Sequence, residues 1–360
     1  MASFSIAAQA SPLAYVTNER DGVTVIDLDK LAIVQTFETG GIGPRGIGIT
    51  EDGKFLVTAN KGTDDISVID TASGVVARRI AVGKNVEFVR VKGGFAYVTY
   101  EPSGPGAPPE ARQGASTPKG TGMAKEPAAP QAAAAAKSGK EGKDDDDLIP
   151  AEIAVVDLAS GKVVQSMKSG RETEGIEFSA DGQLMLVANE GENTVTVYTR
   201  KTGAILRKID VSTFGSRPRG IKISPDGKRY AVTLEFSDQV LLIDAATFAV
   251  VKTGATKKSP YGVSFDASGR RLYVAAARSS VIQVFDADTL AVLGEIPVGA
   301  RCWHFSLTPD GERLIAACGR SDTLVVADVS TFQVVKTFSG ALGPWGVVTF
   351  PRARGSIDVP

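Results

Sequence analysis

The chain repeats one short pattern about seven times along its 360 residues. The pattern joins two strand-like apolar runs by an Asp-Gly turn; it is clearest from Pro44 to Asn60, and degraded copies begin at Glu174, Pro218, Pro260 and Cys302. A further apolar run follows each copy and ends at a regular spacing, as at Asp70, Thr199, Asp244, Asp286 and Asp328. A period of about 40 residues with four short β-patterned runs indicates propeller blades, because one such unit cannot bury its own faces.

The two ends of the chain supply complementary pieces of one further unit. Six complete units begin near Pro44, Asn85, Glu174, Pro218, Pro260 and Cys302. The N-terminal region adds three strand-like runs, and the C-terminal region adds one: Ala14 to Asn18, Val23 to Asp27 and Ile33 to Phe37, then Trp345 to Phe350. We therefore predict an all-β, seven-bladed β-propeller with four-stranded antiparallel blades. Pairing of the N- and C-terminal strands closes it and removes the exposed edges of an open ring.

The predicted propeller covers residues 13–351, with short tails at 1–12 and 352–360. The first tail is small and apolar, and Ala8-Gln9-Ala10 has the A-x-A form of a signal-peptidase site, although no basic segment precedes it. The tail is either the remnant of an export signal or an unstructured extension of a cytosolic protein. We favour export, and hence a periplasmic or secreted bacterial protein, because the segment ends where the first blade begins.

One blade carries a long insertion, residues 102–149. It is rich in Pro, Gly and Ala, contains the acidic run Asp144 to Asp147 and has no aromatic residue. Such a segment buries too little apolar surface to offset the entropy lost on ordering, so we predict that it is disordered. A solvated loop is the favoured interpretation; the alternatives are a lid, a tether or an acidic arm that recognises a partner.

Charge and hydropathy narrow the classes of partner. The formal net charge is −1, so the chain has no general attraction for nucleic acid or anionic membranes. No apolar run reaches the ~18–20 residues that a membrane span requires, and we expect none. We expect a monomer that needs no cofactor to fold; the sequence identifies no cofactor for function.

First strands line the channel of a propeller, so the residues that open them lie at its mouth. At this position the units carry Arg45, Val86, Glu174, Arg219, Tyr261, Trp303 and Trp345, and the next position holds Glu87 in one unit and His304 in another. Two arginines can clamp a carboxylate or phosphate while the aromatic residues stack on a planar ring. We predict a ligand site made of Arg45, Arg219, Tyr261, Trp303, His304 and Trp345. The alternative is that arginines and glutamates pair with each other and the tryptophans plug the channel.

Three of these residues are candidates for acid/base catalysis: His304, Glu87 and Glu174. No phosphate loop, Gly-x-Ser-x-Gly elbow or His-Glu-x-x-His motif occurs, so a familiar hydrolytic triad has little support. A second layer follows the second strands, and we expect its charges to be solvated: Glu19, Lys61, Glu101, Glu190, Glu235 and Arg320.

Cys302 and Cys318 are the only cysteines, and His304 is the only histidine. If Pro309-Asp310-Gly311 forms a three-residue hairpin loop, Thr308 faces Glu312 and the two cysteines are cross-strand neighbours. A disulfide is the simplest outcome in an oxidising compartment. Two buried thiols, or a metal site with His304, are the alternatives, and spacing alone supports no firm metal assignment.

Short phrases of the chain resemble a known family. Tyr15-Val-Thr-Asn18, Leu186-Val-Ala-Asn-Glu190 and Ser224-Pro-Asp-Gly-Lys228 are similar to the YVTN-repeat β-propeller family, over nearly all of the chain outside the insertion. Trp303-His304 before Thr308-Pro-Asp-Gly311, and Pro344-Trp-Gly-Val347, are further similar to the propellers associated with PQQ-dependent (quinoprotein) catabolism. The resemblance implies an exported bacterial propeller with a binding or accessory role. Related propellers include lactonases, haem d1-associated proteins and quinoprotein amine dehydrogenase subunits.

Two functional hypotheses follow. The first is a non-catalytic periplasmic propeller, linked to quinoprotein redox metabolism, that binds a small anionic or aromatic ligand or a periplasmic partner protein at the mouth. The second is an enzyme, either a lactonase-like hydrolase or a redox or haem-associated subunit, that uses Glu87, Glu174 and His304 for acid/base chemistry; a haem ligand could only be His304 or a softer substitute.

Overall fold

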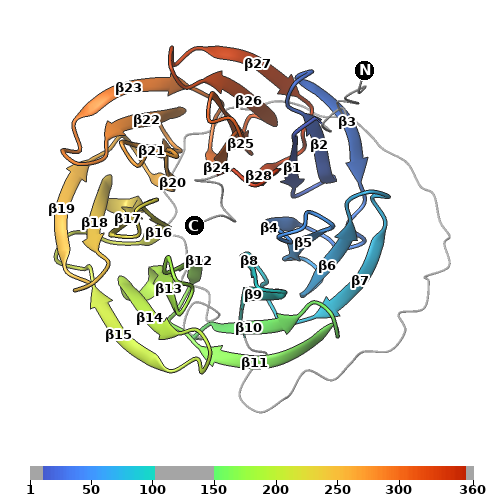
Figure 1. Ribbon diagram of the computed structural model, residues 1–360, viewed down its shortest axis with the longest axis horizontal. Coiled ribbons are helices and arrows are strands. Elements are labelled where there is room, and N and C mark those ends of the chain that lie inside the picture. Colours follow the sequence, from blue (N-terminus) through green and yellow to red (C-terminus); the bar gives the residue numbers. More distant parts are fainter. Residues whose placement is uncertain (1–10, 102–149, 354–360) are drawn as a thin grey trace, which may run out of the picture.

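The computed structural model describes residues 11–101 and 150–353, which form a ring of seven four-stranded antiparallel sheets (Figure 1). In each sheet the first strand lies at the central channel and the fourth at the outer edge. The predicted seven-bladed β-propeller is therefore confirmed.

The strands follow one another around the ring. The closing blade contains β28 (Pro344–Phe350), β1 (Leu13–Asn18), β2 (Gly22–Asp27) and β3 (Ala32–Phe37). Blade 1 contains β4 (Pro44–Ile49), β5 (Phe55–Asn60), β6 (Asp65–Asp70) and β7 (Val76–Ala81). Blade 2 contains β8 (Val89–Lys92), β9 (Phe95–Tyr100), β10 (Glu152–Asp157) and β11 (Lys162–Lys168). Blade 3 contains β12 (Thr173–Phe178), β13 (Leu184–Asn189), β14 (Thr194–Thr199) and β15 (Ile205–Asp210).

The remaining blades have the same order. Blade 4 contains β16 (Pro218–Ile223), β17 (Arg229–Leu234), β18 (Gln239–Asp244) and β19 (Val250–Ala255). Blade 5 contains β20 (Pro260–Phe265), β21 (Arg271–Ala276), β22 (Val281–Asp286) and β23 (Val292–Pro297). Blade 6 contains β24 (Cys302–Leu307), β25 (Arg313–Cys318), β26 (Thr323–Asp328) and β27 (Val334–Ser339). The 3-10 turns η2 (Glu190–Glu192) and η3 (Glu235–Ser237) follow β13 and β17.

The ring closes where β28 pairs with β1. The two strands are antiparallel, with Val16 opposite Val347 and Tyr15 opposite Val348. All four side chains are buried. The C-terminal strand thus becomes the innermost strand of a blade whose other strands come from the N-terminal region, as the leftover pieces of the repeat predict.

The periodic aspartates hold the turn between the third and fourth strands. Oδ1 of Asp244 accepts hydrogen bonds from the backbone N–H and the hydroxyl of Thr247, at 2.7 and 2.8 Å. Asp286 makes the same pair of bonds with Thr289, at 2.8 and 2.7 Å. An aspartate that bonds its own backbone a few residues on fixes a tight turn. The regular spacing of the sequence therefore reflects one turn repeated in successive blades.

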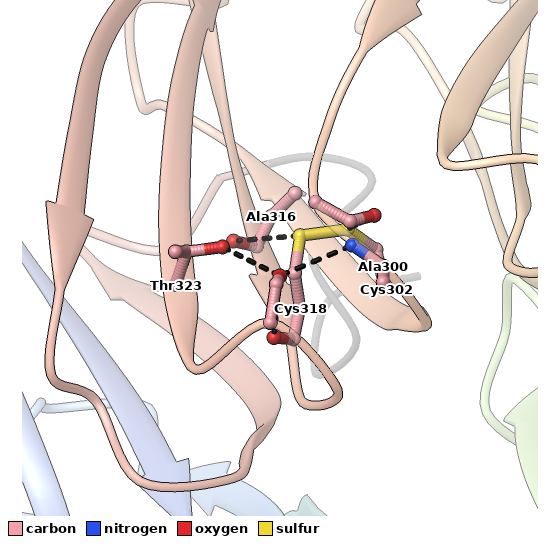
Figure 2. Close-up of a disulfide and its surroundings, with 7 residues drawn as sticks. Ala300, Cys302, Ala316, Cys318 and Thr323 are labelled. Carbon is pink, nitrogen blue, oxygen red and sulfur yellow. Dashed lines mark hydrogen bonds between the residues drawn. A yellow bond between two sulfur atoms is a disulfide. The ribbon is translucent and has the colours of Figure 1, made fainter.

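A disulfide joins Cys302 at the start of β24 to Cys318 at the end of β25 (Figure 2). The three-residue hairpin that suggested this pairing is wrong, because Thr308 bonds Arg313 and does not face Glu312. Thr308 therefore pairs one residue further along the chain than predicted, and this offset continues as far as His304, which lies opposite Ala317. A bulge between Cys302 and His304 then shifts the pairing back by one residue, so that Cys302 lies opposite Cys318 as predicted.

Several predictions concern residues outside the described ranges. The proposed signal remnant lies mostly in 1–10, the disordered insertion in 102–149, and the C-terminal tail mostly in 354–360. Of the short tails, Pro12 accepts a hydrogen bond from the backbone of Leu28, and Ala353 is buried beside Thr349. Within the described ranges, no helix has the length and apolar character to cross a membrane.

Candidate functional site

Each blade begins near the channel with a residue whose backbone is left-handed. These residues are Gly43, Asn85, Glu172, Arg217, Ser259, Arg301 and Gly343. Here the chain turns from the outer strand of one blade into the inner strand of the next. Only glycine adopts this conformation without cost, so charged residues at three of the seven positions are unusual. Backbone strain of this kind clusters at functional sites.

A cavity of about 340 Å³ opens at this end of the channel. We call it the mouth cavity. Among the described residues its cationic side chains are Arg45, Lys61, Arg217, Arg219 and Arg301; its carboxyls are Glu87, Glu101, Glu172, Glu174, Glu190 and Glu235; and its aromatic rings are Tyr100, Tyr261, Trp303 and Trp345. The volume is that of a small-molecule site, and the charged wall suits a polar ligand.

The structure brings most of the predicted site residues to this wall. Arg45, Glu174, Arg219, Tyr261, Trp303 and Trp345 all line the mouth cavity. In blade 2 the wall residue is Glu87, whereas Val86 is buried in the core. In the other six blades the wall residue lies two positions after the left-handed residue, and Glu87 follows Asn85 at the same spacing, so the assignment of Val86 to the mouth was one residue out.

Arg219 is held by a dense set of partners. Its Nη1 lies 2.5 Å from Glu174 Oε1 and 3.1 Å from the Tyr261 hydroxyl, and its Nε lies 2.7 Å from Glu235 Oε2. The same guanidinium forms an ion pair with Glu190. Arg219 is therefore a fixed cation in the wall and has few donors left for a ligand.

Arg45 is paired in a similar way on the other side of the cavity. Its Nε lies 2.5 Å from Glu19 Oε1, and its Nη1 lies 3.1 Å from Glu87 Oε2. Lys61 Nζ lies 2.5 Å from the other Glu87 oxygen. Trp345 is only 2% exposed. This geometry is closer to arginine–glutamate pairing with a tryptophan in the channel than to a pair of free arginine clamps.

Glu87 and Glu174 both lie on the wall of the mouth cavity but have opposite protonation preferences. Burial raises the pKa of Glu174 to about 7, and the Glu87 charge contributes, although Arg219 opposes both effects. Burial also disfavours the charge on Glu87, but Arg45 and Lys61 outweigh it and lower the Glu87 pKa to about 2. Two carboxyls whose environments separate their pKa values in this way can divide acid and base roles between them.

His304 lies deeper than the mouth cavity. It borders a second cavity of about 30 Å³ along the channel, together with Glu174, Arg219 and Lys222. Its ring centroid is 4.4 Å from that of Trp345, and its Nε2 is buried without a hydrogen-bond partner among the described residues. Burial, with Arg219 nearby, lowers the His304 pKa to about 3, so the imidazole is neutral at physiological pH.

Sequence reasoning missed part of the wall. Glu190 and Glu235 were expected to be solvated rim charges, but they are 4% and 5% exposed. Each begins a 3-10 turn and pairs with Arg219, which makes burial tolerable. Glu172, Arg217 and Arg301 were not considered at all. They occupy the same position in the repeat, just before the first strand of each blade. Charged residues at this repeated position could have indicated from the sequence that they lie at the mouth.

The described residues contain no group of three or more His, Cys, Asp or Glu side chains arranged to hold a metal ion. The alternative of a Cys302, His304 and Cys318 site is replaced by the disulfide, which uses both sulfurs.

Comparison with known proteins gives one family match. Residues 154–265 match the family described as "Lactonase, 7-bladed beta-propeller". The matched residues contain much of the mouth-cavity wall, including Glu174 and Arg219. No curated protein matches the chain.

Solved structures support the fold. A candidate 6-phosphogluconolactonase from Bacteroides fragilis is 14% identical, with 96% of this chain and 99% of that chain covered and a TM-score of 0.71. A similar candidate from Bacteroides uniformis is 15% identical, with 94% and 99% covered and a TM-score of 0.69. A chain of Kuenenia stuttgartiensis hydrazine synthase is 18% identical, with 92% and 99% covered and a TM-score of 0.66. At these identities the likeness concerns the fold alone.

Proposed function

We propose that the protein hydrolyses a small polar lactone in the mouth cavity, with Glu174 as the general base. The observation that carries the proposal is the placement of Glu174. This carboxyl lies on the cavity wall, 3.0 Å from the Tyr261 hydroxyl and 2.5 Å from Arg219. Burial and the Glu87 charge give it a pKa of about 7, which suits a base that works near neutral pH. The lactonase family match over this region supports the reaction class.

The reaction needs only water and the lactone. Ionised Glu174 takes a proton from a water molecule as the water oxygen attacks the lactone carbonyl carbon. The carbonyl oxygen becomes an oxyanion, which the fixed positive charge of Arg219 in the cavity wall can stabilise. The ring C–O bond then breaks, and Glu174 returns the proton to the departing alkoxide. The product is the open hydroxy acid.

Glu87 acts on the base through charge. Arg45 and Lys61 keep Glu87 ionised, and its charge favours a proton on Glu174. In this proposal His304 is a neutral neighbour in the channel and takes no proton in the working pH range. The polar wall favours a hydroxylated lactone over an apolar one, and Trp303 offers a flat face to its ring.

The test is lactone hydrolysis by the purified protein, followed by proton release in a pH-stat. Glu174→Gln should lower kcat by 10²–10⁴-fold, the usual contribution of a general base. The matched control is Glu312→Gln, an exposed carboxyl in the turn between β24 and β25, which should keep the wild-type rate. Equal rates for wild type and Glu174→Gln, across neutral and anionic sugar lactones, would refute the proposal.

A second candidate function is ligand binding without chemistry by an exported accessory propeller. The observation that favours it is the saturation of Arg219 by three glutamates, which is typical of a rigid structural wall. The resemblance to quinoprotein-associated propellers points the same way, and the disulfide is consistent with export to an oxidising compartment. This function would be favoured if lactones or their acids bind saturably while lactone hydrolysis is no faster than without the protein.

A further inference from the structure

Three guanidinium groups surround a single carboxylate at one corner of the mouth cavity. Glu235 Oε2 lies 2.7 Å from Arg219 Nε and 3.3 Å from Arg217 Nε, and its other oxygen lies 3.4 Å from Arg301 Nη1. We call these four residues the arginine corner. Burial disfavours the Glu235 charge, but the arginines outweigh it and lower the Glu235 pKa. One ionised carboxylate is shared among three cations.

The three arginines are not equally committed. Arg217 also pairs with Glu172 at 3.5 Å and Glu190 at 2.9 Å, and its guanidinium lies over the ring of Phe236. Arg219 pairs with two further glutamates. Among the described residues, Arg301 has one carboxylate contact, the 3.4 Å approach to Glu235. A guanidinium carries five N–H donors, so Arg301 has most of them available.

The position of Arg301 is fixed even though its side chain is lightly held. Its backbone is left-handed, at φ 54°, immediately before the disulfide at Cys302. Its N–H donates to Ala277 O at 3.0 Å, and its carbonyl accepts from Gly319 N–H at 3.1 Å. A guanidinium on a fixed backbone loses less entropy when a ligand binds, which favours recognition.

All four residues of the arginine corner line the mouth cavity. Blade 5 lies between the blades that carry Arg217 and Arg301, and its residue at the same register is Ser259. Ser259 does not line the mouth cavity, and Glu235 is the residue that contacts both guanidinium groups. Trp303, two residues after Arg301, lies on the same wall and adds an aromatic face.

We propose that Arg301, supported by Arg217, binds an anionic oxygen group of the ligand, a carboxylate or a phosphate, and thereby selects anionic over neutral ligands. Only the identification of that ligand as a lactone rests on the proposed function. The raised pKa of Glu190 supports the inference, because a protonated carboxyl no longer offsets the positive charge of the corner. Arginine matches carboxylate and phosphate with two parallel hydrogen bonds, which lysine cannot reproduce.

The first experiment measures anion binding without turnover. Inorganic phosphate and acetate are titrated calorimetrically into the wild type, Arg301→Gln, Arg301→Lys and the control Arg20→Gln, whose guanidinium lies outside the cavity and pairs with Asp322. We expect Arg301→Gln to bind the preferred anion about tenfold or more weakly, which is the loss of one charge-assisted hydrogen bond. Arg301→Lys should fall between, and Arg20→Gln should match the wild type. The stronger anion identifies the group.

Two results would overturn the inference: equal anion affinity in wild type and Arg301→Gln, or no anion binding by the wild type. The second experiment compares one lactone in neutral and anionic form. Arg301→Gln should raise KM for the anionic form by a clearly larger factor than KM for the neutral form. If no lactone is hydrolysed but phosphate affinity still depends on Arg301, the proposed function fails alone. If hydrolysis depends on Glu174 while Arg301→Gln binds anions normally, only the proposal that Arg301 binds the anion is refuted.

Discussion

The disulfide between Cys302 and Cys318 should stabilise blade 6 by an amount that its loop length sets. The cysteines are 16 residues apart in sequence, and both side chains are buried, at 1% and 0% exposure. Closing a loop of this length in the unfolded chain removes conformational entropy worth about 3 kcal/mol at 25 °C. We expect the double Cys302→Ala, Cys318→Ala variant to lose about that amount, plus a smaller loss from the two buried sulfurs.

The assay is urea unfolding followed by tryptophan fluorescence, with and without reductant, because Trp303 is next to Cys302. Reductant should shift the wild-type midpoint toward that of the double variant and leave the single Cys302→Ala variant unchanged. Two free thiols in the denatured, unreduced wild type would exclude the bond. A midpoint that does not move when the bond is demonstrably open would refute the entropic estimate.

Three further predictions follow from the described contacts. The lactone kcat/KM should rise about tenfold per pH unit below pH 7 and level off above it, because only ionised Glu174 acts as a base. The free energy of unfolding, measured in urea at each pH, should fall as the pH rises from the usual pKa of a glutamate toward 7, because the folded protein holds the Glu174 proton more tightly than the unfolded chain does. Glu177→Gln should cost about 3–5 kcal/mol in urea unfolding, because the fully buried carboxylate pairs with Arg90 at 3.0 Å and Lys222 at 3.5 Å. Replacing residues 103–147 by a short Gly-Ser bridge should leave the melting temperature nearly unchanged, since Tyr100 pairs directly with Glu152; a large loss would mean that the segment packs on the ring.

The repeat made much of the site predictable, because each blade places one residue at the same height in the channel. Arg219, Tyr261 and Trp303 could be assigned to the mouth from register alone. The start of blade 2 could not be located in this way. Val86 was assigned to the mouth in place of Glu87, because the left-handed residue two positions before the mouth, here Asn85, is not marked by any one residue type.

The prediction that Glu190 and Glu235 are solvated was wrong for a different reason. Polar residues after a strand usually face solvent, but η2 and η3 turn Glu190 and Glu235 inward, where Arg219 pairs with both. Whether these glutamates are buried depends on Arg219, and the residues next to each glutamate in the sequence do not reveal that partner. The cysteine pair was predicted through a hairpin that does not exist, and the bulge in β24 corrected the register.

The pairing of β28 with β1 also has a consequence for biosynthesis. β1 leaves the ribosome before the six complete blades, yet its inner partner, Pro344–Phe350, is made after them. Until then the Leu13–Asn18 edge is an unpaired template, open to pairing with another nascent chain. A product truncated before Pro344 keeps that edge permanently. Only chains that reach Phe350 can close the ring. Shorter chains keep an exposed, aggregation-prone strand edge, which chaperones and proteases can recognise.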